Sequence, residues 1–361
     1  MSGWREARSI AALRLDNIGD VIMLGPALRA IKETSPAAHI TLIASRAGAA
    51  AAPLLPWVDD VMVWRPVWQD VSGRIPFDPA REQELIADLA ARRFDAVLIF
   101  TSFSQTPHVP GYVCYLAGIP LRAGESKEFG GSTLTDEQRG APDDLHQAER
   151  NLRLVEHLGF PVRDRRLAVA LPPEAHAAVP RLAAAAGLDA GAPFVLLHPG
   201  ASAAARRVPV ALAAGLARLL TAAGWPVLVT GQAREAGLVA AVVDGAGPRV
   251  RPLVGRTTLG EFAALVDRAA LVVCGNTLPL HLADALDTPV LALYSGTDLD
   301  AQWRPRHTRS RLLRRPTACH PCYRFDCPIG QPCLDIPPEE ATAAALELLV
   351  GAGVGVPGGG R

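Results

Sequence analysis

A polar loop between two apolar segments is the part of the sequence whose residues most clearly suggest chemistry. Residues 275–296 read GNTLPLHLADALDTPVLALYSG, which is typical of a strand end, a loop, a helix and a second buried strand. Asn276 and Thr277 stand where this helix begins, and His281 lies one turn into it. The first backbone N–H groups of a helix have no partners within the helix and carry a partial positive charge. This loop therefore suits an anionic group such as a phosphate.

A second turn of this kind follows the apolar segment FVLL. It reads HPGAS, with Gly200, Ala201 and Ser202, and an arginine pair follows at Arg206 and Arg207. The Ser202 hydroxyl and the N–H groups after Gly200 could contact phosphate or ribose, and Arg206 could pair with a diphosphate. The alternative is a helix-capping serine beside solvated arginines. Two such turns in one half of the chain predict a cradle for a nucleoside diphosphate.

Three further polar residues stand at the ends of predicted strands or the starts of helices. Asp20 closes the turn NIGD, where its carboxylate could act as a general base or cap the next helix. Glu235, in the turn GQARE, could bind ribose hydroxyls or occupy an exposed first helical turn. Thr258 could flank a nucleobase. The residue pattern by itself leaves these alternatives open.

Four cysteines lie close together near the end of the chain. Such a group could hold a tetrahedral zinc ion or, less readily, an iron–sulfur cluster, although the spacing C-x2-C-x4-C-x5-C matches no standard zinc pattern. Reduced thiols that pack a loop and redox-active disulfides are the alternatives. The two other cysteines, at 114 and 274, have apolar neighbours and are expected in the core. The four clustered residues are Cys319, Cys322, Cys327 and Cys333.

Strands and helices alternate along the whole chain and must position these turns. The second-half strands FVLLH, PVLVTG, RVRPLVG, ALVVCG and VLALYSG are apolar without alternation, as expected when helices cover both faces of a parallel sheet. Each half is therefore predicted to be a doubly wound α/β domain that binds ligands at the carboxyl ends of its strands. In the first half, we predict strands at 10–15, 40–44, 61–64 and 96–100, and helices from Val21 and over 80–92 and 146–157.

The composition changes to Pro, Ala and Gly over residues 171–193, so we place a domain boundary at its start. A last helix is predicted over 338–350, and the Gly-rich residues 352–361 are expected to form a disordered tail. A chain of 361 residues has the usual length of two domains.

Bulk properties exclude several classes of protein. Lysine plus arginine and aspartate plus glutamate both number 36, and a net charge of zero argues against a nucleic-acid binder. No signal peptide and no apolar run of about 20 residues is present, so we expect a cytoplasmic protein with reduced cysteines. Arginines crowd residues 304–315, either as a solvated face or as a patch for an anionic ligand. No G-x-G-x-x-G follows the first strand, which disfavours a dehydrogenase.

These motifs, in this order, resemble glycosyltransferase family 9, the ADP-heptose:lipopolysaccharide heptosyltransferases. The resemblance runs from about residue 10 to residue 345 and is carried by LRLDNIGDVIMLGPALRAIKETSP, HPGASAAARRVP, TGQAREAGL, GRTTLGEF, GNTLPLH and QWRP. It implies the GT-B fold, in which two Rossmann-like domains face a cleft and the C-terminal helix crosses back to the first domain. Residues 1–170 would then bind the acceptor, and residues 171–351 the nucleotide sugar.

The resemblance also implies an inverting transfer of a heptose-like sugar from an ADP-heptose type of donor to a lipopolysaccharide or other surface glycan. Asp20 is then the base, Arg206 holds the leaving diphosphate and Glu235 holds the ribose. Thr277 and the Leu278 backbone meet the phosphates. Catalysis needs no cofactor, the zinc would be structural, and the enzyme would be cytoplasmic with peripheral contact to the inner membrane. The acceptor is expected near Ser102, Gln105, His108 and Lys127.

Two positions depart from the family pattern. Arg206 replaces a lysine, and it keeps the charge and can fork onto a phosphate. Asn276 replaces the acid of the D-[ST]-G-x-x-H loop and loses a negative charge that could grip sugar hydroxyls. A different donor sugar or a weakened activity would follow, and a non-catalytic nucleotide-sugar-binding protein and a nucleotide-sugar epimerase are the alternatives. The triplet DLD, residues 298–300, mimics a metal-binding D-x-D motif but is expected to be a surface loop.

Overall fold

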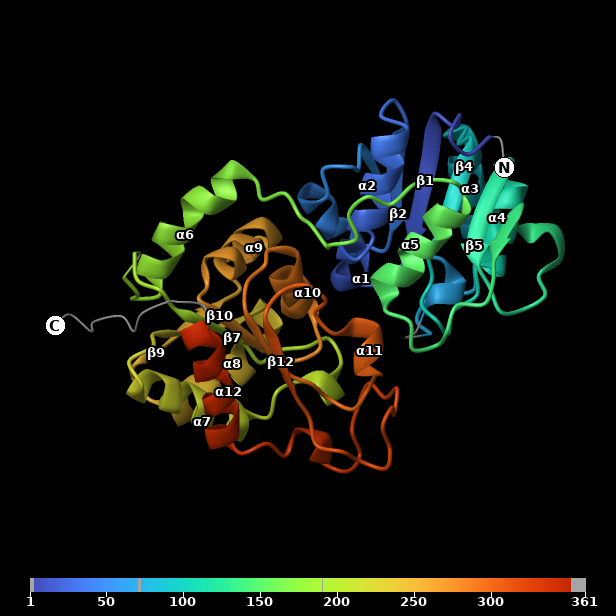
Figure 1. Cartoon of the computed structure of the whole chain (residues 1–361). Helices are drawn as coiled ribbons and strands as arrows, with labels where there is room; N and C mark the ends of the chain where they lie inside the picture. Colours follow the sequence, from blue (N-terminus) through green and yellow to red (C-terminus); the bar gives the residue numbers. More distant parts are fainter. Residues whose placement is uncertain (1–2, 71–72, 190, 352–361) are drawn as a thin grey trace. The chain divides into compact units, whose positions relative to one another are not determined.

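The computed structural model describes residues 3–70, 73–189 and 191–351 of the chain. It divides into two compact units, Met1–Ala170 and Leu171–Arg361 (Figure 1). The division falls where the composition changes to Pro, Ala and Gly. The tail that we predicted as disordered lies outside the described residues. No helix in the described part of the chain is both long enough and apolar enough to cross a membrane.

The first unit is built on a six-stranded parallel sheet in the order β3-β2-β1-β4-β5-β6. Its order reverses between β1 and β4, which pair from Ile10 opposite Ala96 to Leu13 opposite Ile99. Doubly wound sheets bind ligands beyond the carboxyl ends of their strands at such a reversal. The strands are β1 (Ser9–Arg14), β2 (His39–Ala44), β3 (Asp60–Val63), β4 (Ala96–Ile99), β5 (Leu121–Glu125) and β6 (Asp136–Gln138).

One predicted helix of the first unit is divided in two. The helix expected from Val21 begins at Ile18, ends at Ile22 and resumes at Gly25, because Pro26 has no N–H group to continue the hydrogen-bond ladder. The sequence pattern did not predict strands β5 (Leu121–Glu125) and β6 (Asp136–Gln138) or helix α4 (His108–Leu116), which are short or polar. The helices are α1 (Ile18–Ile22), α2 (Gly25–Thr34), α3 (Pro79–Ala91), α4 (His108–Leu116) and α5 (Gln147–His157).

The second unit repeats the same design with the strand order β12-β11-β10-β7-β8-β9. All its strands are parallel, and its order reverses between β7 and β10, which pair from Val195 opposite Leu271 to His198 opposite Cys274. The strands are β7 (Val195–His198), β8 (Val227–Gly231), β9 (Val250–Val254), β10 (Leu271–Cys274), β11 (Val290–Leu293) and β12 (Ser310–Leu313).

Helices cover the second sheet, with α6 packed against α9, and α7 between α8 and α12. The last helix, α12, packs against α7 and strands β10 to β12, and its crossing to the first domain stays a prediction. An ion pair of 3.0 Å between Arg311 and Glu347 also ties the arginine-rich segment to α12. The helices are α6 (Pro173–Ala185), α7 (Val210–Ala222), α8 (Ala236–Ala246), α9 (Leu259–Arg268), α10 (Leu278–Ala285), α11 (Asp300–Trp303) and α12 (Pro338–Gly351).

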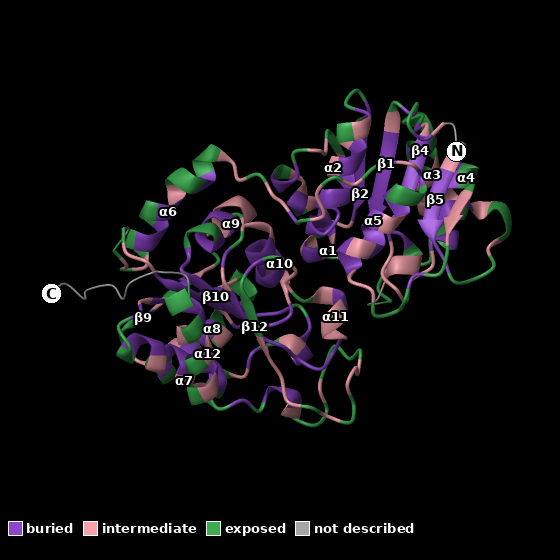
Figure 2. Cartoon of the chain, viewed as in Figure 1, coloured by how far each residue is buried: buried purple, intermediate pink, exposed green. Residues whose placement is uncertain are grey.

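The central strands of both sheets are buried, as the strand pattern predicted, whereas the edge strand β12 is partly exposed (Figure 2). All four residues of β10 are fully buried, and each large aliphatic side chain buried in this way contributes about 1.5–3 kcal/mol. Cys114 and Cys274 lie in these cores, and burial raises the pKa of the Cys114 thiol to about 12. The rigid centre of each sheet fixes the positions of the loops that follow its strands.

Candidate functional site

A buried arginine organises the turn that follows β1. The side chain of Arg14 is fully buried, and its Nε lies 2.9 Å from Asp16 Oδ2. Its Nη2 donates hydrogen bonds to Asp20 Oδ1 at 3.0 Å and to Ser102 Oγ at 2.8 Å. A buried guanidinium requires anionic and hydrogen-bonding partners. One cation therefore joins two carboxylates after β1 to a hydroxyl that follows β4.

Asp20 is the third residue of α1, and the cap residue of this helix is Asn17. The Asn17 N–H donates to Asp20 Oδ2 at 3.1 Å, so the acid reaches back to the cap residue instead of being the cap itself. Its side chain is 15% exposed, which leaves the carboxylate accessible to a substrate. The role of Asp20 as a base stays a prediction, now with a defined carboxylate position.

Asp16 is a second acid that the sequence analysis did not single out. Its Oδ1 accepts hydrogen bonds from Gln105 Nε2 at 2.7 Å and Gln69 Nε2 at 3.0 Å. Burial raises the pKa of Asp16, and the nearby charge of Asp20 adds to this, while Arg14 and the two amides oppose it. The available signal was a pair of acids, four residues apart, directly after a strand that ends in an arginine.

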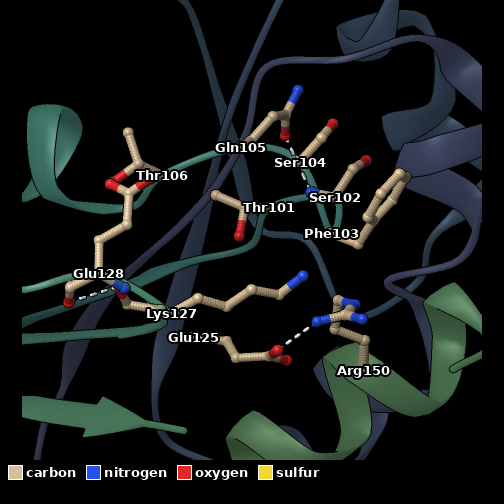
Figure 3. Close-up of a pocket in the computed structure, with 11 residues that line it drawn as sticks. Thr101, Ser102, Phe103, Ser104, Gln105, Thr106, Glu125, Lys127, Glu128 and Arg150 are labelled. Atoms are coloured by element: carbon tan, nitrogen blue, oxygen red, sulfur yellow. Dashed lines mark hydrogen bonds and ion pairs between the residues drawn. The ribbon is translucent and has the colours of Figure 1, made fainter. Parts of the chain in front are cut away.

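A pocket lies beside this turn, beyond the carboxyl ends of β4 and β5, with a volume of about 140 Å³ (Figure 3). Glu125 pairs with Arg150 inside it, and the Lys127 Nζ lies 5.4 Å from the centre of the Phe103 ring. The second oxygen of Glu125, Oε2, is buried without a hydrogen-bond partner among the described residues. The lining residues are Thr101, Ser102, Phe103, Ser104, Gln105, Thr106, Glu125, Ser126, Lys127, Glu128 and Arg150.

Three of the four residues expected near the acceptor line this pocket, and His108 does not. The His108 ring is buried and forms hydrogen bonds with Ser126 Oγ at 2.7 Å and Thr133 Oγ1 at 2.8 Å. A Cβ at Gly130 would lie 1.8 Å from its Nδ1, so the loop packs directly onto the imidazole. His108 is therefore a buried residue that supports the loop.

In the second unit, Gly200 and Glu235 are in direct contact. A Cβ at Gly200 would lie only 2.4 Å from Glu235 Oε1, so a larger residue there would force the Glu235 carboxylate to move. Glu235 is buried, and its Oε2 accepts the Gln232 N–H at 2.8 Å. The alternative of an exposed first-turn glutamate is thus wrong. The carboxylate lies at the turn after β8, beside the turn after β7.

The turn HPGAS does not lead directly into a helix. A short 3-10 turn spans Ala204–Arg206, and α7 begins only at Val210, after Pro209. The N–H groups that follow Gly200 are therefore not at the start of an α-helix, the position from which their binding of phosphate was predicted. Ser202 is exposed and Ala201 is buried.

Arg206 and Asn276 are brought together by an acid that we expected on the surface. Asp298 is only 8% exposed, and its Oδ1 accepts from Arg206 Nη2 at 2.9 Å. Asn276 Nδ2 donates to Asp298 Oδ2 at 3.0 Å and to Thr297 Oγ1 at 3.1 Å. Arg206 Nε donates to the same Thr297 hydroxyl at 3.2 Å. The surface-loop expectation is wrong at Asp298, because this carboxylate neutralises the guanidinium.

The start of α10 adds polar groups near Arg206. Thr277 is its cap residue in an extended conformation, and its hydroxyl is buried without a hydrogen-bond partner among the described residues. Leu278 is the first residue of the helix. Burial lowers the pKa of His281 to about 4, Asp284 opposes this shift, and the Arg206 cation adds a smaller lowering effect. At neutral pH the buried imidazole is therefore uncharged.

Thr258 has a structural role in the described part of the chain. It is the cap residue of α9, and its Oγ1 accepts the Glu261 N–H at 3.2 Å, while Glu261 Oε2 accepts the Thr258 N–H at 2.8 Å. This is a capping box. The proximity of Thr258 to a nucleobase stays a prediction.

The four clustered cysteines are free thiols that range from the exposed Cys319 to the buried Cys333. Within residues 3–70, 73–189 and 191–351, no three His, Cys, Asp or Glu side chains are arranged to hold a metal ion. A structural zinc at these cysteines stays a prediction from the sequence.

Two parallel doubly wound sheets, each with polar groups at its order reversal, form an α/β arrangement that many nucleotide-binding proteins share. The family model of glycosyltransferase family 9 (heptosyltransferase) matches residues 83–332. The chain belongs to this family and is a glycosyltransferase, and the predicted α/β fold of two Rossmann-like halves is confirmed.

Known proteins resemble the chain over almost its whole length. Lipopolysaccharide heptosyltransferase 2 of Salmonella typhimurium is 26% identical, over 93% of this chain and 97% of that protein. A glycosyl transferase family 9 structure from Veillonella parvula has a TM-score of 0.79 at 20% identity, over 95% of this chain and 98% of that one. E. coli ADP-heptose lps heptosyltransferase II has a TM-score of 0.72 at 21% identity, over 95% of this chain and 99% of that one.

Proposed function

We propose that this glycosyltransferase moves a heptose-like sugar from an ADP-heptose type of donor to a lipopolysaccharide or other lipid-linked surface glycan, with inversion at the anomeric carbon. The family membership supports the sugar class, and the similarity to proteins named for ADP-heptose and lipopolysaccharide supports the donor and acceptor. The observation that carries the proposal is that Arg14 donates hydrogen bonds both to Asp20 and to Ser102, which lines the pocket. This contact supports the proposal, because the Asp20 carboxylate, the proposed base, shares a guanidinium with a residue that lines the pocket.

The second unit would hold the donor. The Arg206 guanidinium, the Leu278 N–H at the start of α10 and the Thr277 hydroxyl, which has no hydrogen-bond partner among the described residues, suit a diphosphate. The neutral His281 imidazole can donate one hydrogen bond without adding charge. The buried carboxylate of Glu235 would accept hydrogen bonds from ribose hydroxyls.

The first unit would hold the acceptor. The pocket offers the buried Glu125 Oε2 as an acceptor for a sugar hydroxyl. Lys127 and Arg150, which pair here with Asp143 and Glu125, would turn to an anionic substituent when it binds. Figure 3 shows the amino group of Lys127 and the guanidinium of Arg150 pointing into the same space. Because such an acceptor is anchored in lipid, the proposed location of the enzyme is the cytoplasmic side of the inner membrane.

The reaction would be a single displacement. Asp20 takes the proton of the acceptor hydroxyl, and the oxygen forms a bond to the anomeric carbon of the donor sugar. The bond from that carbon to the diphosphate oxygen breaks, and the electron pair leaves with the nucleoside diphosphate. Arg206 and the Leu278 N–H at the start of α10 stabilise the charge that develops on the leaving group. Attack opposite the leaving group inverts the configuration, and the proposed reaction needs no metal.

A direct transfer assay tests this proposal. The purified enzyme, given ADP-heptose and a lipopolysaccharide acceptor that lacks heptose, is expected to add one heptose and release ADP, as detected by mass spectrometry. UDP-glucose serves as the control donor. Release of free heptose in equal amounts with and without acceptor, or no turnover with ADP-heptose, would contradict the proposal.

Replacing Lys127 with alanine is expected to raise the KM for the acceptor by about three- to tenfold, because one exposed cation contributes modestly to binding an anion. The kcat and the affinity for ADP should stay the same. Arg139→Ala is the matched control, since Arg139 is an exposed cation that pairs with Glu137 outside the pocket lining. Equal KM values for Lys127→Ala and the wild type would remove this pocket from the acceptor site.

A further inference from the structure

Position 276 carries asparagine instead of an acid, but the side chain of Asp298 places a carboxylate beside it. Asn276 follows β10, and Asp298 lies after the neighbouring strand β11, 22 positions later in the chain. The Asn276 amide and the Asp298 carboxylate are 3.0 Å apart, and both contact the Thr297 hydroxyl. A negative charge is therefore present in this cluster, although the residue at 276 is neutral.

The orientation of the Asn276 amide is determined by its neighbours. Its Oδ1 accepts the backbone N–H of Ser295 at 3.3 Å and the Ser295 hydroxyl at 3.0 Å. A backbone N–H can only donate, so the amide oxygen faces Ser295 and the NH₂ group faces Asp298. An aspartate at 276 would instead place a second carboxylate about 3 Å from Asp298 Oδ2, where like charges repel strongly. Asn276 and Asp298 thus fit one another as an amide donor and a carboxylate acceptor.

The carboxylate is aimed at Arg206. Both of its oxygens lie 2.9 Å from Arg206 Nη2, and the Thr297 hydroxyl donates to Oδ2 at 2.6 Å. Arg206 Nε is directed to the same hydroxyl, which fixes one edge of the guanidinium. The Arg206 side chain remains 30% exposed, and its Nη1 group takes no part in these contacts. A single carboxylate keeps the local charge at zero, so an anionic ligand is not repelled.

We propose that Asp298 is the positioning residue of the donor site and replaces, from the β11 side, the acid that this chain lacks at position 276. This inference rests on the proposed function. Asp298 holds one edge of Arg206, so that the other N–H groups face the leaving diphosphate. On this proposal, the donor site needs one carboxylate next to Arg206, which the loop after β10 or the loop after β11 could supply.

A reciprocal exchange of the two side chains tests this. Asp298→Asn is expected to lower kcat/KM for ADP-heptose transfer by about 100-fold and to weaken binding of ADP alone. Asn276→Asp, with two carboxylates in contact, should be similarly impaired. The double variant, Asn276→Asp with Asp298→Asn, again has one carboxylate and one amide and should recover at least about tenfold over Asp298→Asn. Asp300→Asn, the other acid of the triplet, is the matched control and should behave as the wild type.

Three measurements separate the outcomes. Thermal unfolding of all four variants shows which of them fold, ADP binding by calorimetry reports the donor site, and turnover reports the reaction. If the double variant folds but is no more active than Asp298→Asn, the proposed role of Asp298 is wrong. The proposal is also wrong if Asp298→Asn binds ADP and turns over normally. Absence of ADP binding by the wild type would instead refute the donor site of the proposed function, and this inference with it.

Discussion

Replacing Asp20 with asparagine is expected to lower kcat by about 10³-fold or more, while the affinity for ADP remains close to that of the wild type. A general base contributes about 10²–10⁴ in rate, and an amide cannot take the acceptor proton. Asparagine is nearly isosteric, although its single amide oxygen can replace only one of the two carboxylate oxygens that accept from Arg14 and from the Asn17 N–H. Turnover under saturating substrates, together with calorimetry of ADP binding, measures the two quantities separately.

The exposed acid Asp88 on α3 offers a control, because Asp88→Asn changes the same net charge away from the turn after β1. A melting temperature of Asp20→Asn close to that of the wild type would show that the buried Arg14 has kept its partners. Normal turnover in Asp20→Asn would remove the base from the mechanism, and Asp16, which shares the same guanidinium, would be the next residue to replace.

Loss of the Arg206 guanidinium is the second large expected effect. Arg206→Ala should lower kcat by about 10²–10³-fold and weaken ADP binding, because a group that stabilises the leaving diphosphate acts most strongly in the transition state. Arg206→Lys keeps the charge but cannot form the same fork, so an intermediate activity is expected. Values of kcat and KM for ADP-heptose, with ADP affinity, provide the measurement.

Arg206→Ala also leaves the buried Asp298 carboxylate without its cation, which destabilises the fold by itself. The double variant Arg206→Ala with Asp298→Ala removes both charges and distinguishes the loss of chemistry from the loss of stability. Arg207→Ala is the matched control, since Arg207 is the exposed neighbour whose Nε donates to the Ala201 carbonyl. If the Arg207 variant loses as much activity as the Arg206 variant, the diphosphate role cannot be specific to Arg206.

The two units position their polar groups at the same place in the sheet. In each sheet the strand order reverses between the first strand and the fourth, and the loops after these two strands carry the polar groups. Arg14 joins the loops after β1 and β4, and the Arg206–Asp298 pair joins the segment after β7 to the loop after β11, beside the β10 loop with Asn276. Loops leave room at a reversal, because the helices that follow the strands turn to opposite faces of the sheet.

Long apolar strands were predicted almost residue by residue, and short polar ones were not. The predicted strand at 40–44 is observed as His39–Ala44, because five consecutive buried residues, four of them aliphatic, suit a strand that is covered on both faces. The strand Asp136–Gln138 carries three polar residues at the sheet edge and has no such signal. The helix expected directly after HPGAS was displaced to Val210, because Pro209 cannot donate within a helix but suits its start.

By itself, the sequence determined the α/β class, the two doubly wound halves and most of the residues that stand at the functional turns, because strand hydrophobicity and turn composition are local properties. Only the tertiary structure decided which polar groups meet. Arg14 contacts Ser102 across 88 positions, and Arg206 contacts Asp298 across 92. Such pairs depend on the register of neighbouring parallel strands, and a buried charge acquires its partner only when the sheet has assembled around it.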